Sequence, residues 1–200
     1  MRKAKQKKTR TGSEAAENGR LTADAWATAG LELLAARGID AVRIDPLAAS
    51  LGVTKGSFYW HFKDRAHLLE AMLSMWRRSA TIAVIARLES QGSPTERLRR
   101  LIDLPVSATH AQYGQSLELA VRLWARRDEQ AAAAIEEIDQ QRLAYLASLL
   151  RANGMAGPKV GARAYLVYAF ILAEALIPAK AAGEVTSPAA LRKLIDEITQ

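Results

Sequence analysis

The 200-residue sequence contains no cysteine and no uninterrupted apolar run of the roughly 20 residues that span a bilayer. Without cysteine, the chain has no disulfide bonds, no thiolate metal ligands and no cysteine nucleophile. Basic residues at the start of the sequence are not followed by the apolar stretch of a secretory signal. We therefore expect a cytoplasmic protein.

Motifs of catalytic and metal sites are also missing. The stretch GVTKGS is similar to a phosphate-binding loop, but the four-residue gap before Gly-Lys is absent and no strand precedes it. No nucleophile is paired with a base. His110 has no second His, Asp or Glu at metal-ligand spacing. The sequence thus predicts neither an enzyme nor a metal or cofactor site.

Alternating strand patterns are absent, whereas apolar residues recur at helical spacing along most of the chain. Half of the residues are hydrophobic, which is enough for a sizeable core. We predict an all-α fold of about nine helices. The helices are expected at about 22–37, 45–51, 54–61, 64–88, 94–104, 117–127, 128–153, 158–178 and 188–199.

Several of these boundaries rest on capping residues. Thr22 is a predicted N-cap, and Asp45 is expected to cap a helix with Pro46 in its first turn. Ser93 and Glu96 form a capping-box pattern. Gly52 is expected to end the second helix in the left-handed conformation that a tight corner requires.

The net charge of +7 is concentrated at the N-terminus. Residues 1–20 hold seven Lys/Arg and two Glu, a net +5, whereas residues 21–65 hold five charges of each sign. One interpretation is a solvated, disordered tail. The other is a flexible arm that adds sequence-independent attraction to phosphates.

The two short helices joined by LGVTK predict a helix-turn-helix over about 44–63, whose second helix can lie in the major groove of DNA. Phe58 and Phe62 are four residues apart and should share the buried face. Tyr59 and Trp60 should then face outward with Lys55, where they can contact phosphates and base edges. Spacing alone leaves open that the aromatic residues simply pack in a core.

The segment GIDAVRIDPLAASLGVTKGSFYWHFKDRAHLL resembles the DNA-binding domain of the TetR (tetracycline repressor-like) family of bacterial transcription regulators. The resemblance covers about residues 20–75. It implies a DNA-binding domain over 21–66 and a regulatory and dimerisation domain over 67–200. The DNA-contacting positions that it implies are Arg43, Thr54, Lys55, Gly56, Ser57, Tyr59, Trp60, His61, Lys63 and Arg65.

One position departs from the family pattern. The second helix often opens on a Ser or Thr that caps it and meets a phosphate, and here Arg43 stands in that place. Arg43 is able to bind a phosphate or a guanine edge. Asp45 would repel phosphate, and this is why we interpret it as a cap.

For the second half of the chain, the resemblance implies a homodimer and a ligand cavity. The segment YLVYAFILAEAL is apolar nearly all round and needs cover on more than one side. The helices at about 158–178 and 188–199 are therefore expected to pair across a two-fold axis, unless the first is an internal core helix. Candidate ligand-binding residues, each of which also suits a core, are Trp76, His110, Tyr113 and Trp124.

Together these features predict a bacterial transcriptional regulator, in the first instance a homodimeric repressor that a small-molecule effector releases from a palindromic operator. Two alternatives stay open. One is a DNA-binding protein without ligand control, and the other is a helical protein–protein interaction module that exposes Tyr59 and Trp60 as an adhesive patch.

Overall fold

The computed structural model describes residues 21–90, 92–103, 115–176 and 188–199, and within these ranges it contains helices and no strand. The helices are α2 (Ala23–Arg37), α3 (Ile44–Ser50), α4 (Lys55–Phe58), α5 (Arg65–Arg77), α6 (Ala83–Glu89), α7 (Pro94–Asp103), α8 (Gln115–Ala125), α9 (Glu129–Ala152), α10 (Lys159–Leu176) and α12 (Pro188–Thr199). A 3-10 turn, η1 (Ile39–Ala41), follows α2, and a π-helical turn, η2 (Arg78–Ile82), joins α5 to α6. With α5, η2 and α6 counted as one helix, the described part has nine helices, which confirms the predicted all-α fold.

Capping side chains set the starts of several helices. Thr22 Oγ1 accepts a hydrogen bond from the backbone N–H of Ala25 at 3.2 Å, and Asp128 Oδ1 accepts one from Ala131 at 2.9 Å. Ser93 and Glu96 exchange bonds in the predicted capping box, with 2.7 Å between Ser93 N and Glu96 Oε2. The backbone N–H of Ser93 accordingly lowers the pKa of the Glu96 carboxyl.

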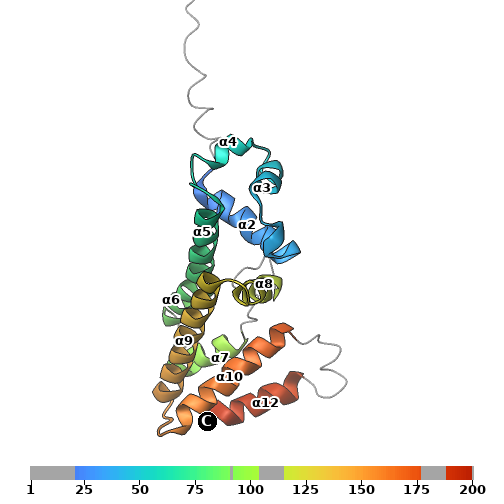
Figure 1. Cartoon of the computed structure of the whole chain (residues 1–200). Coiled ribbons are helices and arrows are strands. Elements are labelled where there is room, and N and C mark those ends of the chain that lie inside the picture. Colours follow the sequence, from blue (N-terminus) through green and yellow to red (C-terminus); the bar gives the residue numbers. More distant parts are fainter. Residues whose placement is uncertain (1–20, 91, 104–114, 177–187, 200) are drawn as a thin grey trace, which may run out of the picture.

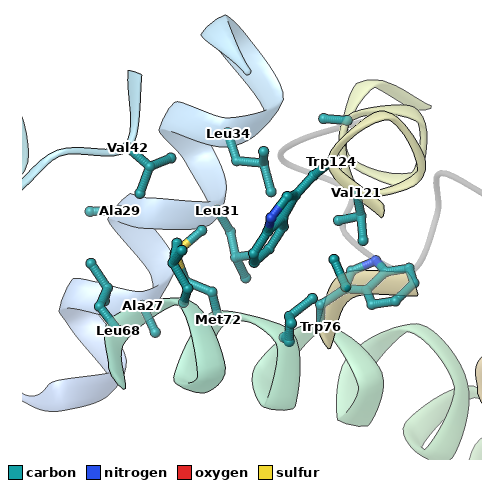
Figure 2. Packing of buried hydrophobic residues seen from close by; sticks show 14 of the residues in the cluster. Ala27, Ala29, Leu31, Leu34, Val42, Leu68, Met72, Trp76, Val121 and Trp124 are labelled. Atoms are coloured by element: carbon teal, nitrogen blue, oxygen red, sulfur yellow. The ribbon is translucent and has the colours of Figure 1, made fainter. Parts of the chain in front are cut away.

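Two buried clusters hold the helices together. The first joins α2, α3, α4 and α5 to α8 and the first half of α9. Figure 2 shows Leu31 and Leu34 of α2 facing Val121 and Trp124 of α8. The second cluster joins α7, the second half of α9, α10 and α12. The predicted division of the chain at residues 66 and 67 therefore falls inside the first cluster, and α8 packs directly against α2.

The long helix predicted over 64–88 is interrupted. It starts after Asp64, whose Oδ1 caps it by accepting from His67 N at 2.9 Å, but η2 widens it at Arg78–Ile82. In Figure 1, α2, α3 and α4 lie at one end of the molecule, α10 and α12 lie at the other, and α5 runs between them. This helix consequently links the two ends of the protein.

Candidate nucleic-acid interface

The corner between α3 and α4 is tight and depends on Gly52. Gly52 has φ of 67°, and its N–H donates to Ala49 O at 3.2 Å. The next residue, Val53, donates to Ala48 O at 3.0 Å and packs against the first core cluster. The left-handed glycine therefore turns the chain within two residues, as predicted.

Phe58 and Phe62 anchor α4 and the turn after it. Phe58 is completely buried and Phe62 is 2% exposed. The Phe58 ring lies 5.3 Å from that of Trp26 in an edge-to-face arrangement and 5.3 Å from that of Phe62. This confirms the predicted inward face, and it fixes the orientation of α4 relative to α2.

The neighbouring aromatic side chains point the other way. Tyr59 is 54% exposed and Trp60 is 79% exposed. Trp60 borders an open groove of about 650 Å³, whose other lining residues are Thr54, Gly56, Ser57 and His61. The structure thus brings five of the predicted contact residues together around one hollow on the protein surface.

The backbone in this region differs in two details from the prediction. The helix ends at Phe58 rather than at Trp60 or His61, and the N–H groups of His61 and Phe62 both donate to Phe58 O at 3.0 Å. Thr54 occupies the N-cap position with extended dihedral angles, but its side chain makes no capping bond. The short helix relies on its buried phenylalanines instead.

Asp45 does not cap α3, contrary to the prediction. Helix α3 begins one residue earlier, at Ile44, and the side chain at its N-cap, Arg43, makes no capping bond. The Asp45 carboxylate instead pairs with Lys55 at the start of α4, with 3.1 Å between Lys55 Nζ and Asp45 Oδ1 and 3.2 Å to Oδ2. The first turn of α3 is therefore tied to the first turn of α4.

Arg65 is engaged within the protein. Its Nε donates to Val42 O at 2.6 Å, and its Nη2 donates to Ile39 O at 3.0 Å. These bonds hold the segment before α3 against the start of α5. Lys63, by contrast, has an exposed side chain, while its backbone N–H lies 3.4 Å from His67 Nδ1.

Two of the four predicted ligand-binding residues lie in the part of the chain that the structure describes. Trp76 and Trp124 are buried in the first core cluster, where they contribute to packing (Figure 2). His110 and Tyr113 lie outside the described residues.

Between α8, α9 and α10 lies a polar network that sequence reasoning missed. Arg142 of α9 donates to both oxygens of Glu118, at 3.1 and 3.3 Å. Arg122 donates to both oxygens of Asp139, at 3.0 and 2.7 Å. The Tyr168 hydroxyl donates to Asp139 Oδ1 at 2.6 Å and accepts from both arginines at 3.1 Å. Two positive and two negative side chains thus balance each other in a partly buried site.

The same network reaches the π-helical turn. Arg142 Nη2 donates to Ala80 O at 3.2 Å, and Arg142 Nε donates to Thr81 Oγ1 at 3.2 Å. The spacing of Glu118 and Arg122, four residues apart on one helix, was the available sequence signal. Their partners on α9 and α10 had no local signal.

Burial and hydrogen bonding shift the pKa values of this network. Burial works to raise the pKa of Asp139, but hydrogen bonds from Arg122 and Tyr168 outweigh it and hold the pKa below its usual range. Burial raises the pKa of Tyr168 to about 12, with a contribution from its bond to Asp139. Asp139 is therefore ionised and Tyr168 neutral at neutral pH.

In the part of the chain that the structure describes, no helix is long and apolar enough to pass through a bilayer. The same residues include no group of three or more His, Asp or Glu side chains arranged to hold a metal ion.

Comparisons with known proteins agree with the helix-turn-helix geometry. The HTH-type transcriptional regulator SrpR of Pseudomonas putida is 35% identical over 65 residues, which are 32% of this chain and 29% of SrpR. The match therefore spans less than a third of that relative.

Two solved structures share the fold over most of the chain. A protein of Saccharomonospora viridis assigned as a transcriptional regulator, in complex with choline, has a TM-score of 0.69 at 18% identity, covering 92% of this chain and 95% of that one. The transcriptional regulator FadR of Bacillus subtilis, in complex with stearoyl-CoA, has a TM-score of 0.61 at 17% identity, covering 87% and 95%.

The sequence profile of the bacterial regulatory proteins of the tetR family matches residues 28–72, which run from α2 through the helix-turn-helix into α5. Over these residues, the chain is therefore similar to the DNA-binding part of the tetR family of bacterial regulatory proteins.

Proposed function

We propose that this protein is a homodimeric transcriptional repressor that binds a palindromic DNA operator through α4 and is released by a small-molecule effector. The observation that carries the DNA-binding part is the division of the aromatic segment. Phe58 and Phe62 fix α4 from inside, while Tyr59 and Trp60 are exposed beside the groove. A regulator rather than an enzyme is also what the family and the relative SrpR indicate.

Each contact residue has a proposed role. Tyr59, Trp60 and His61 offer flat surfaces and hydrogen-bonding groups for base edges and thymine methyl groups. Thr54 and Ser57 offer hydroxyl groups to phosphates, and Gly56 lets the backbone come close to the duplex. Arg43, Lys55 and Lys63 supply positive charge. Arg65 supports the interface through its bonds to Val42 O and Ile39 O and adds positive charge at the start of α5.

The homodimer is supported by apolar side chains on the outer faces of α10 and α12. Tyr165 and Leu166 of α10 and Leu194 of α12 are each more than half exposed. The opposite face of α10 is buried, with Val167 and Ile171 in the second core cluster. A second copy of the chain would cover the exposed side and form a four-helix interface from the helices predicted at 158–178 and 188–199.

Effector release is supported by the packing around the long linking helix. The two solved structures named above are complexes with small molecules, choline and stearoyl-CoA. Here α8 packs on α2, which in turn packs on the helix-turn-helix, and Arg142 holds the η2 turn in the long helix. An effector that favours a different packing of α8 or η2 would change the spacing of the two α4 helices, which must match major grooves about 34 Å apart.

The decisive experiment selects bound duplexes from random sequence and then measures affinity for the selected operator. We expect a palindromic site, and we expect Tyr59→Ala to lower operator affinity without changing the helical content or the dimer. Leu123→Ala is the matched control, because Leu123 is also exposed but lies on α8, away from the groove. Failure of the natural protein to bind any duplex at low ionic strength would exclude the proposal.

The two alternatives make different predictions in this experiment. A DNA-binding protein without ligand control would select an operator but show no small molecule that raises its thermal stability and lowers its operator affinity reciprocally. A protein–protein interaction module would select no duplex at all. The basic arm, residues 1–20, lies outside the described residues, and its deletion is expected to weaken binding to all DNA sequences equally.

A further inference from the structure

The ion pair between Asp45 and Lys55 involves a residue of the proposed DNA-binding surface, Lys55. It joins the first turn of α3 to the first residue of α4, and both carboxylate oxygens lie within 3.2 Å of Lys55 Nζ. Both partners are open to solvent, with side-chain exposures of 72% for Asp45 and 52% for Lys55. An exposed pair of this kind contributes little to stability, so the fold alone does not account for it.

The other charges of this region are used differently. Residues 43–65 contain two carboxylates, Asp45 and Asp64, and Asp64 caps α5. Of the four basic residues there, Arg65 is bound to backbone carbonyls. Asp45 is therefore a solvent-exposed carboxylate beside Lys55 of the recognition helix α4. It lies in a surface that must approach the phosphates of DNA.

A carboxylate in this place has two physical effects on DNA binding. It repels phosphates, and it cancels the charge of Lys55, so that sequence-independent attraction is weakened. It also restrains Lys55 Nζ and sets an acceptor beside a donor. A lysine donates to guanine O6 and N7, whereas a carboxylate accepts from cytosine N4, so the pair together matches the major-groove edge of one G·C pair.

We propose that Asp45 is a specificity-determining residue that acts through Lys55, by lowering affinity for random DNA and by favouring a G·C pair in each operator half-site. This inference depends on the proposed function, because it needs DNA at α4. It makes Asp45 a cause of discrimination between sequences rather than a source of affinity.

The test compares Asp45→Asn with the natural protein on the selected operator and on a random-sequence duplex of equal length, over a range of salt concentrations. Affinity for the random duplex should rise roughly threefold or more, with a salt dependence steeper by about one unit of log K per log salt. The ratio of operator to random affinity should fall about fivefold or more. A repeated selection with Asp45→Asn should lose the preference for G·C at one position.

Two variants serve as controls. Glu136→Gln makes the same change in net charge on the exposed face of α9, far from α4 (Figure 1), and should leave the ratio unchanged. In a Lys55→Met background, Asp45→Asn should no longer change the ratio, because the proposal has Asp45 act through Lys55.

Three outcomes would overturn the inference. The first is a ratio of operator to random-duplex affinity that stays constant in Asp45→Asn. The second is an equal fall in affinity for both duplexes, which is expected if the ion pair only holds α3 against α4. The third is the same change of the ratio in Glu136→Gln. These outcomes leave the proposed function intact when the natural protein binds its selected operator. A natural protein that binds neither duplex would instead exclude the proposed function itself.

Discussion

Adjacent side chains in the segment 58–62 have opposite environments, and their order along the helix explains why. Phe58 and Phe62 lie one turn apart and therefore share a face, which α2 covers through Trp26. Tyr59 and Trp60 fall between them and remain exposed. The same aromatic stretch thus holds the recognition helix in place and supplies its outer surface.

Tyr168 carries a prediction that concerns a single side chain. Its pKa is raised from about 10 in an unfolded chain to about 12 in the fold, chiefly by burial. Its neutral form therefore adds stability that is fully present below pH 10 and is lost as the pH rises from about 10 to 12. We expect the free energy of unfolding of the natural protein to exceed that of Tyr168→Phe at pH 8 and to approach it near pH 12.

Chemical denaturation at a series of pH values measures this difference. Because lysine deprotonation affects both proteins alike, the comparison isolates the tyrosine. A stability difference that stays constant between pH 8 and pH 12 would show that the hydroxyl does not titrate as a buried member of the network.

The helix-turn-helix as an element depends on two glycines with different tasks. Gly52 has φ of 67°, and no atom lies within 4 Å of the position that a Cβ would take, so a side chain there meets backbone strain but no clash. Gly56 lies in α4 without a positive φ, and a Cβ there would lie 3.7 Å from Thr54 Oγ1. We expect Gly52→Ala to lower the free energy of unfolding by about 1–2 kcal/mol.

Gly56→Ala should behave in the opposite manner. Alanine is a better helix former than glycine, so stability should stay constant or rise by up to about 1 kcal/mol, while operator affinity falls because the added methyl group projects into the groove. Urea denaturation and operator titration of the two variants check both halves. Equal loss of stability in both, or an unchanged operator affinity in Gly56→Ala, would contradict these roles.

In the whole molecule, α8 and Arg142 connect regions that lie far apart in sequence. One side of α8 packs Val121 and Trp124 against α2, and the same helix carries Glu118 and Arg122 into the polar network. Arg142 extends the network to the η2 turn. Helix α8 is therefore joined to α2 by apolar contacts and to α9, α10 and η2 through an ionic network.

Arg142→Met tests the strength of this connection. It leaves Glu118 buried beside Arg122 without its second partner, so we expect a loss of about 3–5 kcal/mol in the free energy of unfolding. The double variant Arg142→Met with Glu118→Gln should recover part of the loss, because the uncompensated charge is gone. Urea denaturation at one fixed protein concentration measures both, since dimerisation would otherwise change the apparent stability. A loss below about 1 kcal/mol in the single variant would show that water reaches Glu118.

Much of the fold follows from signals that act within a few residues of the chain. Thr22, Ser93 and Asp128 cap helices that start where the sequence predicts, because a side-chain oxygen reaches an N–H only two or three residues away. Gly52 turns the chain for an equally local reason, and the spacing of Phe58 and Phe62 predicts the buried face of α4. These features made the helix order and the candidate interface predictable.

The partners of Asp45, Arg65 and Arg142 were not predictable in this way. They lie 10, up to 26 and up to 62 residues away along the chain, and each pair forms because apolar packing brings two elements together. The expected cap at Asp45 gave way to an ion pair, and Trp76 and Trp124, which suit either a ligand site or a core, are buried in the first cluster. The partner of a charged side chain depends on how the helices pack, because its interaction energy is set by the groups that the packing places beside it and by how far they are removed from water.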